Sequence, residues 1–205
     1  MRTIILQEMV SLDGFMAGPN GEFDWPLADD EFERHVNSLM DDADTILLGR
    51  NTYQMFASYW PTAPTNTTGT IKNSGGAKFV VPTSVSNAHD EVALKMNSYH
   101  KIVFSKTLEK VEWNNSKLFK EVNPKEIIRM KEQPGKNMLV LGSGELVRAL
   151  MKFGLIDKYR LWVNPIILGK GRPLFGALSD CQKLKLVGTK TFNSGLTELC
   201  YEQVK

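Results

Sequence analysis

Short apolar runs alternate along the chain with segments in which apolar residues recur every three or four positions. Continuous runs of this kind predict strands that are buried on both faces. Strands are expected at 3–10, 45–49, 78–81, 101–105, 117–122, 137–142, 159–165, 184–191 and 197–201. Helical spacing predicts helices at 29–41, 50–60, 89–99 and 124–131, and a further helix that Gly154 ends.

The stretch 29–41 shows the helical pattern most clearly. Its apolar residues fall on one stripe, made by Phe32, Val36, Leu39 and Met40. Three acids, Asp29, Asp30 and Glu31, stand in its first turn, where the helix dipole favours negative charge.

Strands and helices alternate over most of the chain, which predicts an α/β class with a mostly parallel central sheet and flanking helices. The last strands lack intervening helices, so we expect an antiparallel edge at the carboxyl end. No repeat or linker divides residues 1–205, which predicts a single domain. Residues 61–77 are polar and without period, and we expect a long flexible loop there.

Composition and charge argue against several classes of partner. The net charge is only +2 and the basic residues are scattered, which argues against nucleic acid and against an anionic membrane. No stretch approaches the length of a membrane span, and the amino terminus does not resemble a signal peptide, so we expect a cytoplasmic protein. Cys181 and Cys200 lie in no metal-binding pattern, so no zinc site is expected, although a disulfide between them stays open.

The segment Gly142-Ser143-Gly144 joins a predicted strand to a predicted helix. Bare glycine backbone at a helix N-terminus lets a phosphate approach the free N–H groups. The dinucleotide fingerprint G-x-G-x-x-G is incomplete, because Val147 occupies the third glycine position. A plain structural turn is therefore an equal alternative, and the carboxylate of Glu145 argues mildly against an anion.

Two more strand ends carry groups that suit an anion. Gly49, Arg50 and Thr52 follow one strand, and arginine binds phosphate through two hydrogen bonds. Ser105, Lys106 and Thr107 follow another strand. In an open α/β sheet, ligands bind outside the carboxyl ends of the strands, so these groups suit a dinucleotide. The alternative is that Arg50 is a surface residue and that Asn51 or Thr52 caps a helix.

Five motifs, taken together and in this order, resemble the dihydrofolate reductase superfamily. The resemblance is closest to its bacterial branch related to the reductase domain of riboflavin biosynthesis. The motifs are SLDGFMAGPNGEFDW, LLGRNTY, VFSKTL, VLGSGELVRAL and VNPIILGKGRPLF, and they span nearly the whole chain. The resemblance implies a dihydrofolate reductase-like fold that binds NADPH.

The resemblance also implies residue roles. It places the cofactor's phosphates and adenosine beside Gly49, Arg50, Thr52, Ser105 and Lys106. The turn under the pyrophosphate would be formed by Gly142, Ser143, Gly144, Glu145 and Leu146. The segment 11–25, with Phe23 and Trp25, would lie near the nicotinamide and the substrate.

The sequence offers two candidates for the acid that would donate a proton to the substrate. Asp29 and Asp30 stand about where dihydrofolate reductases carry a substrate-binding acid, although the distance to LLGR is a few residues longer. Asp29 is therefore one catalytic candidate, and stabilisation of the helix N-terminus is at least as good an interpretation. Asp13 is the second candidate, and its alternative role is in the turn that Asp-Gly favours.

We therefore expect an NADPH-dependent reductase that transfers a hydride to a small pterin-like or pyrimidine-like ring. A riboflavin-pathway pyrimidine reductase is one alternative, in which Lys170 and Arg172 would meet a substrate phosphate, although such residues more often form a solvated loop. A non-catalytic nucleotide-binding protein that retains the fold is the other. The resemblance implies a homodimer that the VNPIILGKGRPLF segment and the late strands help to form.

Overall fold

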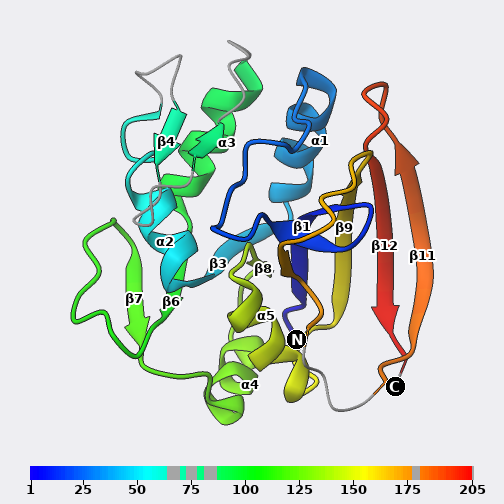
Figure 1. The fold of residues 1–205 in the computed structure, drawn as a ribbon. Helices are drawn as coiled ribbons and strands as arrows, with labels where there is room; N and C mark the ends of the chain where they lie inside the picture. The colour runs from blue at the N-terminus through cyan, green and yellow to red at the C-terminus, as the bar shows by residue number, and fades with distance from the viewer. Residues whose placement is uncertain (64–69, 73–77, 81–86, 177–180, 205) are drawn as a thin grey trace.

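An eight-stranded sheet forms the centre of the computed structural model, which describes residues 1–63, 70–72, 78–80, 87–176 and 181–204 (Figure 1). Its strands lie in the order β11-β12-β9-β1-β8-β3-β6-β7. Their bounds are β1 Ile4–Ser11, β3 Ala43–Gly49, β6 His100–Phe104, β7 Ser116–Phe119, β8 Asn137–Val140, β9 Lys158–Asn164, β11 Leu184–Thr191 and β12 Thr197–Gln203.

Strand direction confirms the expected class. The neighbouring pairs from β9 through β1, β8, β3 and β6 to β7 are all parallel. β12 is antiparallel to β9, and β11 is antiparallel to β12. The carboxyl-terminal hairpin therefore supplies the predicted antiparallel edge.

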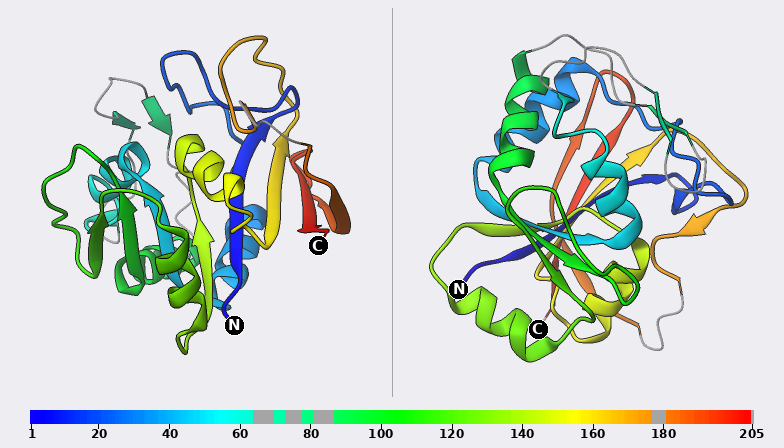
Figure 2. Two further views of the ribbon diagram at one scale, coloured as in Figure 1. Left: turned by 90° about the horizontal axis from the view of Figure 1, so that it is seen from below. Right: turned by 90° about the vertical axis from the view of Figure 1, so that its left-hand side faces the viewer.

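Helices cover the two faces of the sheet (Figure 2). On one face, α1 (Asp30–Met40), α2 (Arg50–Ala57) and α3 (Asn87–Ser98) pack Met40, Tyr53 and Val92 against the strands. On the other face, α4 (Pro124–Glu132) and α5 (Gly144–Lys152) contribute Ile127 and Leu150 to a second core cluster. Burial on both faces explains why the central strands have no polar alternation.

Two short strand pairs lie outside the main sheet. β2 (Phe15–Ala17) pairs with β10 (Arg172–Pro173), which joins the segment after β1 to the segment after β9. β4 (Thr70–Lys72) pairs with β5 (Lys78–Val80). β4 falls inside the 61–77 segment expected to be a loop, so that prediction was wrong at Thr70–Lys72. Residues 64–69 and 73–77 of the same segment lie outside the described residues.

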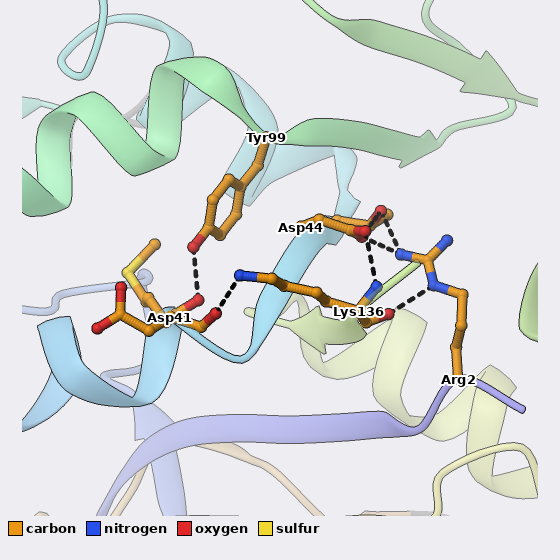
Figure 3. A network of polar contacts seen from close by, with 7 residues as sticks. Arg2, Asp41, Asp44, Tyr99 and Lys136 are labelled. Atoms are coloured by element: carbon orange, nitrogen blue, oxygen red, sulfur yellow. Dashed lines mark hydrogen bonds and ion pairs between the residues drawn. The ribbon is translucent and has the colours of Figure 1, made fainter. Parts of the chain in front are cut away.

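A polar network fastens the amino-terminal ends of three parallel strands (Figure 3). Arg2, just before β1, pairs with Asp44 of β3 and donates from Nε to the carbonyl of Lys136, 2.6 Å away. The Lys136 amide in turn donates to Asp44 at 2.8 Å. The Tyr99 hydroxyl donates to the Met40 carbonyl at 2.5 Å, which ties α1 to the same region. These contacts hold the amino-terminal ends of the strands together. The glycine turns lie at the other, carboxyl-terminal ends.

Cys181 and Cys200 are both free thiols, which settles the open question of a disulfide between them. Among the described residues, no helix combines the length and the apolar character that crossing a bilayer would require.

Candidate functional site

The three strand ends singled out by the sequence are neighbours in the sheet. β8 pairs with β3, and β3 pairs with β6, all in parallel. The turns that begin at Gly49, Ser105 and Gly142 therefore leave the same edge of the sheet side by side. β1 lies on the other side of β8, so its carboxyl end joins the same edge.

Two helices begin at this edge without a capping side chain. Gly49 is the N-cap of α2 and Ser143 is the N-cap of α5, and neither makes a side-chain hydrogen bond to its helix. The first amides of each helix are thus left without the usual side-chain acceptor. Two uncapped helix N-termini together offer N–H donors and partial positive charge to an anion.

The glycines pack the two turns together. The Gly49 amide donates to the Gly142 carbonyl at 3.0 Å. A Cβ on Gly49 would lie 2.3 Å from Ser143 Oγ, and a Cβ on Gly144 would lie 2.6 Å from Met16 Sδ. Gly142 has a φ of +91°, which side-chain-bearing residues rarely adopt. Gly49 and Gly144 therefore make room for protein atoms, a role that the phosphate interpretation did not include.

The remaining cofactor-binding candidates differ in exposure. Arg50 is exposed, and its Nη1 donates to Thr107 Oγ1 at 2.8 Å. Ser105 is buried, and its hydroxyl accepts from the amides of Thr107 and Leu108 at 3.2 and 3.0 Å. Lys106 is exposed beside them. A guanidinium, an ammonium and two hydroxyls therefore lie in the segment after β6, where the resemblance leads us to expect the adenosine.

The side chains of the other two candidates of the α5 turn, Glu145 and Leu146, differ in burial. The Glu145 side chain is exposed. Leu146 is buried, and its side chain belongs to the core cluster beneath α5. Only the backbone of Leu146 is therefore available to a ligand at the turn.

Asp29 has the role of a helix cap. It is the N-cap of α1, and its Oδ1 accepts from the Phe32 amide at 2.8 Å. This contact matches the stabilising interpretation of the acids in the first turn. It leaves the catalytic role of Asp29 a prediction.

Asp13 is engaged in the turn after β1. Its carboxylate accepts from the Ser11 hydroxyl at 2.6 Å and from the amides of Leu168 and Gly169 at 3.1 and 2.8 Å. The hydrogen bond from Ser11, aided by the two amides, holds the pKa of Asp13 below its ordinary value. An acid with a lowered pKa is ionised at neutral pH and is poorly suited to donate a proton.

The substrate candidates Phe23 and Trp25 pack edge to face, with ring centroids 5.6 Å apart. The Trp25 indole nitrogen is buried and has no hydrogen-bond partner among the described residues. The same segment is tied to β9, because the Leu27 amide donates to Asn164 Oδ1 at 2.7 Å. Asn164 is fully buried and holds this segment, a contact that sequence reasoning did not single out.

Sequence reasoning also missed Glu8, which lies in β1 and is 8% exposed. A Cβ on Gly142 would lie 3.3 Å from Glu8 Oε2 and 3.0 Å from Thr52 Oγ1. Burial raises the pKa of Glu8 to about 8. No local pattern in the sequence marks this acid as part of the site.

A second buried acid, Glu198 of β12, has a structural role. It accepts from Trp162 Nε1 at 2.8 Å and contacts His35 Nε2 at 2.9 Å. Burial raises its pKa, but hydrogen bonds from these two partners outweigh burial and leave the pKa below its ordinary value. His35 thus joins α1 to the sheet.

A shallow hollow lies elsewhere, between β7 and α4. Its lining residues are Lys117, Phe119, Glu126, Arg129, Met130 and Gln133. It contains none of the candidate residues, and it lacks the helix N-termini and the buried acid of the glycine turns. We therefore place the candidate site at the carboxyl edge of the sheet.

Comparison with known families agrees with this geometry. Residues 2–197 match the RibD C-terminal domain. The chain belongs to this family. The match covers all the strand ends described above, and it confirms the suspected superfamily.

Individual proteins resemble the chain over nearly its whole length. The chain is 31% identical to the uncharacterized protein YyaP of Bacillus subtilis, over 98% of this chain and 94% of the relative. A putative riboflavin biosynthesis protein from Shewanella sp. PV-4 superposes with a TM-score of 0.69, at 23% identity and 99% coverage of both chains. Dihydrofolate reductase from Enterococcus faecalis, complexed with NADP(H), superposes with a TM-score of 0.60 at 10% identity. This superposition covers 99% of this chain and 97% of the Enterococcus enzyme.

Proposed function

We propose that this protein is an NADPH-dependent reductase that transfers a hydride to a small pterin-like or pyrimidine-like ring. The observation that carries the proposal is the junction of two uncapped helix N-termini through Gly49 and Ser143. Such a junction suits a ligand with a pyrophosphate. The family, and the NADP(H) complex of a similar fold, support the choice of dinucleotide.

The residues present fit this cofactor. The first amides of α2 and α5, from Arg50 and Gly144 onward, would hold the pyrophosphate. Arg50, Ser105 and Lys106 would hold the adenosine side, where a guanidinium suits the additional phosphate of NADPH. When bound, NADPH supplies the hydride.

The protein's own part is to bind, to orient and to exclude water. Asn164 holds the segment that carries Trp25 against the end of β9, so that Phe23 and Trp25 have a fixed support. These two rings would cover the substrate. Asp29 and Asp13 stay candidates for the acid, although both carboxylates already accept hydrogen bonds within the chain.

Reduction of a riboflavin-pathway pyrimidine is the second candidate. The family and the Shewanella neighbour favour it. Lys170 and Arg172 are both exposed near β10, where they would meet a substrate phosphate. Turnover of the phosphoribosylamino-pyrimidine intermediate, with Lys170→Ala raising KM rather than lowering kcat, would support this candidate over a pterin-like substrate.

Oxidation of NADPH in the presence of candidate rings tests the catalytic proposal. Absorbance of the reduced nicotinamide is followed with a dihydropterin, with the pyrimidine intermediate and with no added substrate. The proposal expects substrate-dependent oxidation. Tight NADPH binding with no oxidation by any ring would instead favour a non-catalytic nucleotide-binding protein.

We further propose that the protein forms a homodimer through its carboxyl-terminal edge. Leu186 and Val187 of β11 are 51% and 48% exposed, on a strand with no partner on its outer side in the described sheet. Exposed apolar residues at a sheet edge are typical of an interface. Sedimentation equilibrium should show a dimer for the wild type and a monomer for Leu186→Lys with Val187→Lys.

A further inference from the structure

Glu8 is a buried acid, and one of its two side-chain oxygens has no hydrogen-bond partner within the described part of the chain. It lies in the central strand β1 and is 8% exposed. Its Oε2 has no hydrogen-bond partner among the described residues. A buried polar atom without a partner costs folding free energy, so it calls for a functional explanation.

The unpaired oxygen points to the junction of the two glycine turns. Glu8 Oε2 and Thr52 Oγ1 lie 3.3 and 3.0 Å from the position that a Cβ of Gly142 would take. That position is free only because residue 142 is glycine. The carboxyl group therefore faces the same spot as the first turn of α2 and the turn that leads into α5.

Among the residues that the structure describes, no charged group acts on Glu8 to stabilise a carboxylate. Its strand neighbour on β9 is Leu161. The charged side chains of the helices packed nearby point elsewhere: Arg50 reaches Thr107, Arg148 reaches a backbone carbonyl near β10, and Glu145 is exposed. Burial raises the pKa of Glu8 to about 8, opposed only by a hydrogen bond with the Met9 backbone. At neutral pH the acid therefore keeps its proton and is a hydrogen-bond donor.

The protonation state of Glu8 decides which ligand groups its side chain can bind at the glycine turns. A carboxylate beside two helix N-termini would compete with a phosphate for the same positive potential and would repel it. A protonated acid offers an O–H group at the same place without that repulsion.

We propose that Glu8 binds the dinucleotide as a neutral acid, donating a hydrogen bond from Oε2 to an oxygen of the cofactor beside Gly142 and Thr52. This inference rests on the proposed function, since it assumes that the glycine turns hold a dinucleotide. It makes binding depend on a proton. The dinucleotide binds the protonated protein, and above the pKa the protein must take up a proton to bind.

Calorimetric titration of NADPH in two buffers with different heats of ionisation measures that proton. For the wild type we expect affinity about tenfold weaker at pH 9 than at pH 7, and uptake of close to one proton at pH 9. Glu8→Gln is neutral at every pH and keeps a donor, so its affinity should stay flat and its proton uptake should be near zero. Glu132→Gln, at an exposed acid of α4, is the matched control and should behave like the wild type.

Comparison with Glu8→Gln also removes the contribution of other groups that titrate in the same pH range. Lys101, whose pKa burial lowers to about 8, titrates in the wild type and in Glu8→Gln alike, so it cancels in the comparison. The inference is overturned if both proteins show the same pH dependence, or if the wild type takes up no proton at pH 9. Binding by neither protein at pH 7 would overturn the proposed function, and the role of Glu8 with it.

Discussion

Gly49 and Ser143 are 94 positions apart in the sequence, yet a Cβ on Gly49 would lie 2.3 Å from Ser143 Oγ. A second contact, from the Gly49 amide to the Gly142 carbonyl, holds the same junction at 3.0 Å. The starts of α2 and α5 are thereby held side by side. The spacing of any ligand held by both helix N-termini depends on this contact.

Gly49→Ala should therefore disturb both stability and binding. The added Cβ would force Ser143 or the α5 turn to move, and overpacking of this kind costs about 1–3 kcal/mol. We expect that loss in urea denaturation, together with loss of NADPH binding. Gly188→Ala in β11 is the matched control, because its Cβ would meet only Cys200 Cβ at an ordinary 3.8 Å. Equal losses in both variants would show that the junction has no special role.

Arg50→Ala should weaken NADPH more than NADH. The exposed guanidinium is already held beside Thr107, so it is oriented without a ligand and suits the extra phosphate of NADPH. Loss of a charge-assisted hydrogen bond of about 1.5–3 kcal/mol predicts a decrease of ten- to a hundredfold in NADPH affinity. Fluorescence titration of both nucleotides checks this, with Arg129→Ala of α4 as the control. An equal decrease in the affinity for NADH would show that Arg50 does not bind the extra phosphate of NADPH.

Glu8→Gln should alter the pH dependence of stability even without ligand. The ordinary pKa of a glutamate is 4.5, and the folded protein raises it to about 8. As the pH rises between these values, the unfolded chain loses its proton while the folded chain retains it, so wild-type stability falls. Glu8→Gln lacks this loss and should exceed the wild type by a few kcal/mol at about pH 8.5.

Urea denaturation of both proteins at pH 5, 7 and 8.5 measures the difference, which should be smallest at pH 5. A difference that does not grow with pH would show that Glu8 ionises as freely in the folded protein as in the unfolded chain.

Asp29→Ala should destabilise the protein by about 1 kcal/mol, because the Phe32 amide loses its acceptor. Asp29→Asn retains a capping oxygen, and its stability should stay close to that of the wild type. With capping as the role of Asp29, turnover by Asp29→Asn should also be retained. A folded, stable Asp29→Asn without turnover would instead assign Asp29 the catalytic role that the resemblance implies.

The sequence predicts the sheet and its helices well where the pattern is local. The stripe on residues 29–41 corresponds to α1 at Asp30–Met40, because apolar spacing and an N-terminal acid act within one element. The common direction of the central strands also follows, since alternating strands and helices favour parallel neighbours. β2 and β10 were not predicted, because each has two or three residues and exists only through the other.

The site is harder to predict because its chemistry depends on distant contacts. Glycine in a turn suggests open backbone, but the spaces at Gly49 and Gly144 are occupied by Ser143 and Met16. The pKa of Glu8 depends on burial by neighbouring strands and helices, which no spacing within β1 reveals. The helix-terminal role of Asp29 was one of the alternatives read from the sequence, whereas the hydrogen bonds of Asp13 to the distant amides of Leu168 and Gly169 were not.

The most direct test of the account is calorimetric titration of the purified protein with NADPH and, in parallel, with NADH at neutral pH. We predict saturable binding of NADPH, at least about tenfold tighter than that of NADH. Binding of neither nucleotide would contradict the account. The junction of Gly49 with Ser143 would then be a packing contact of the fold alone.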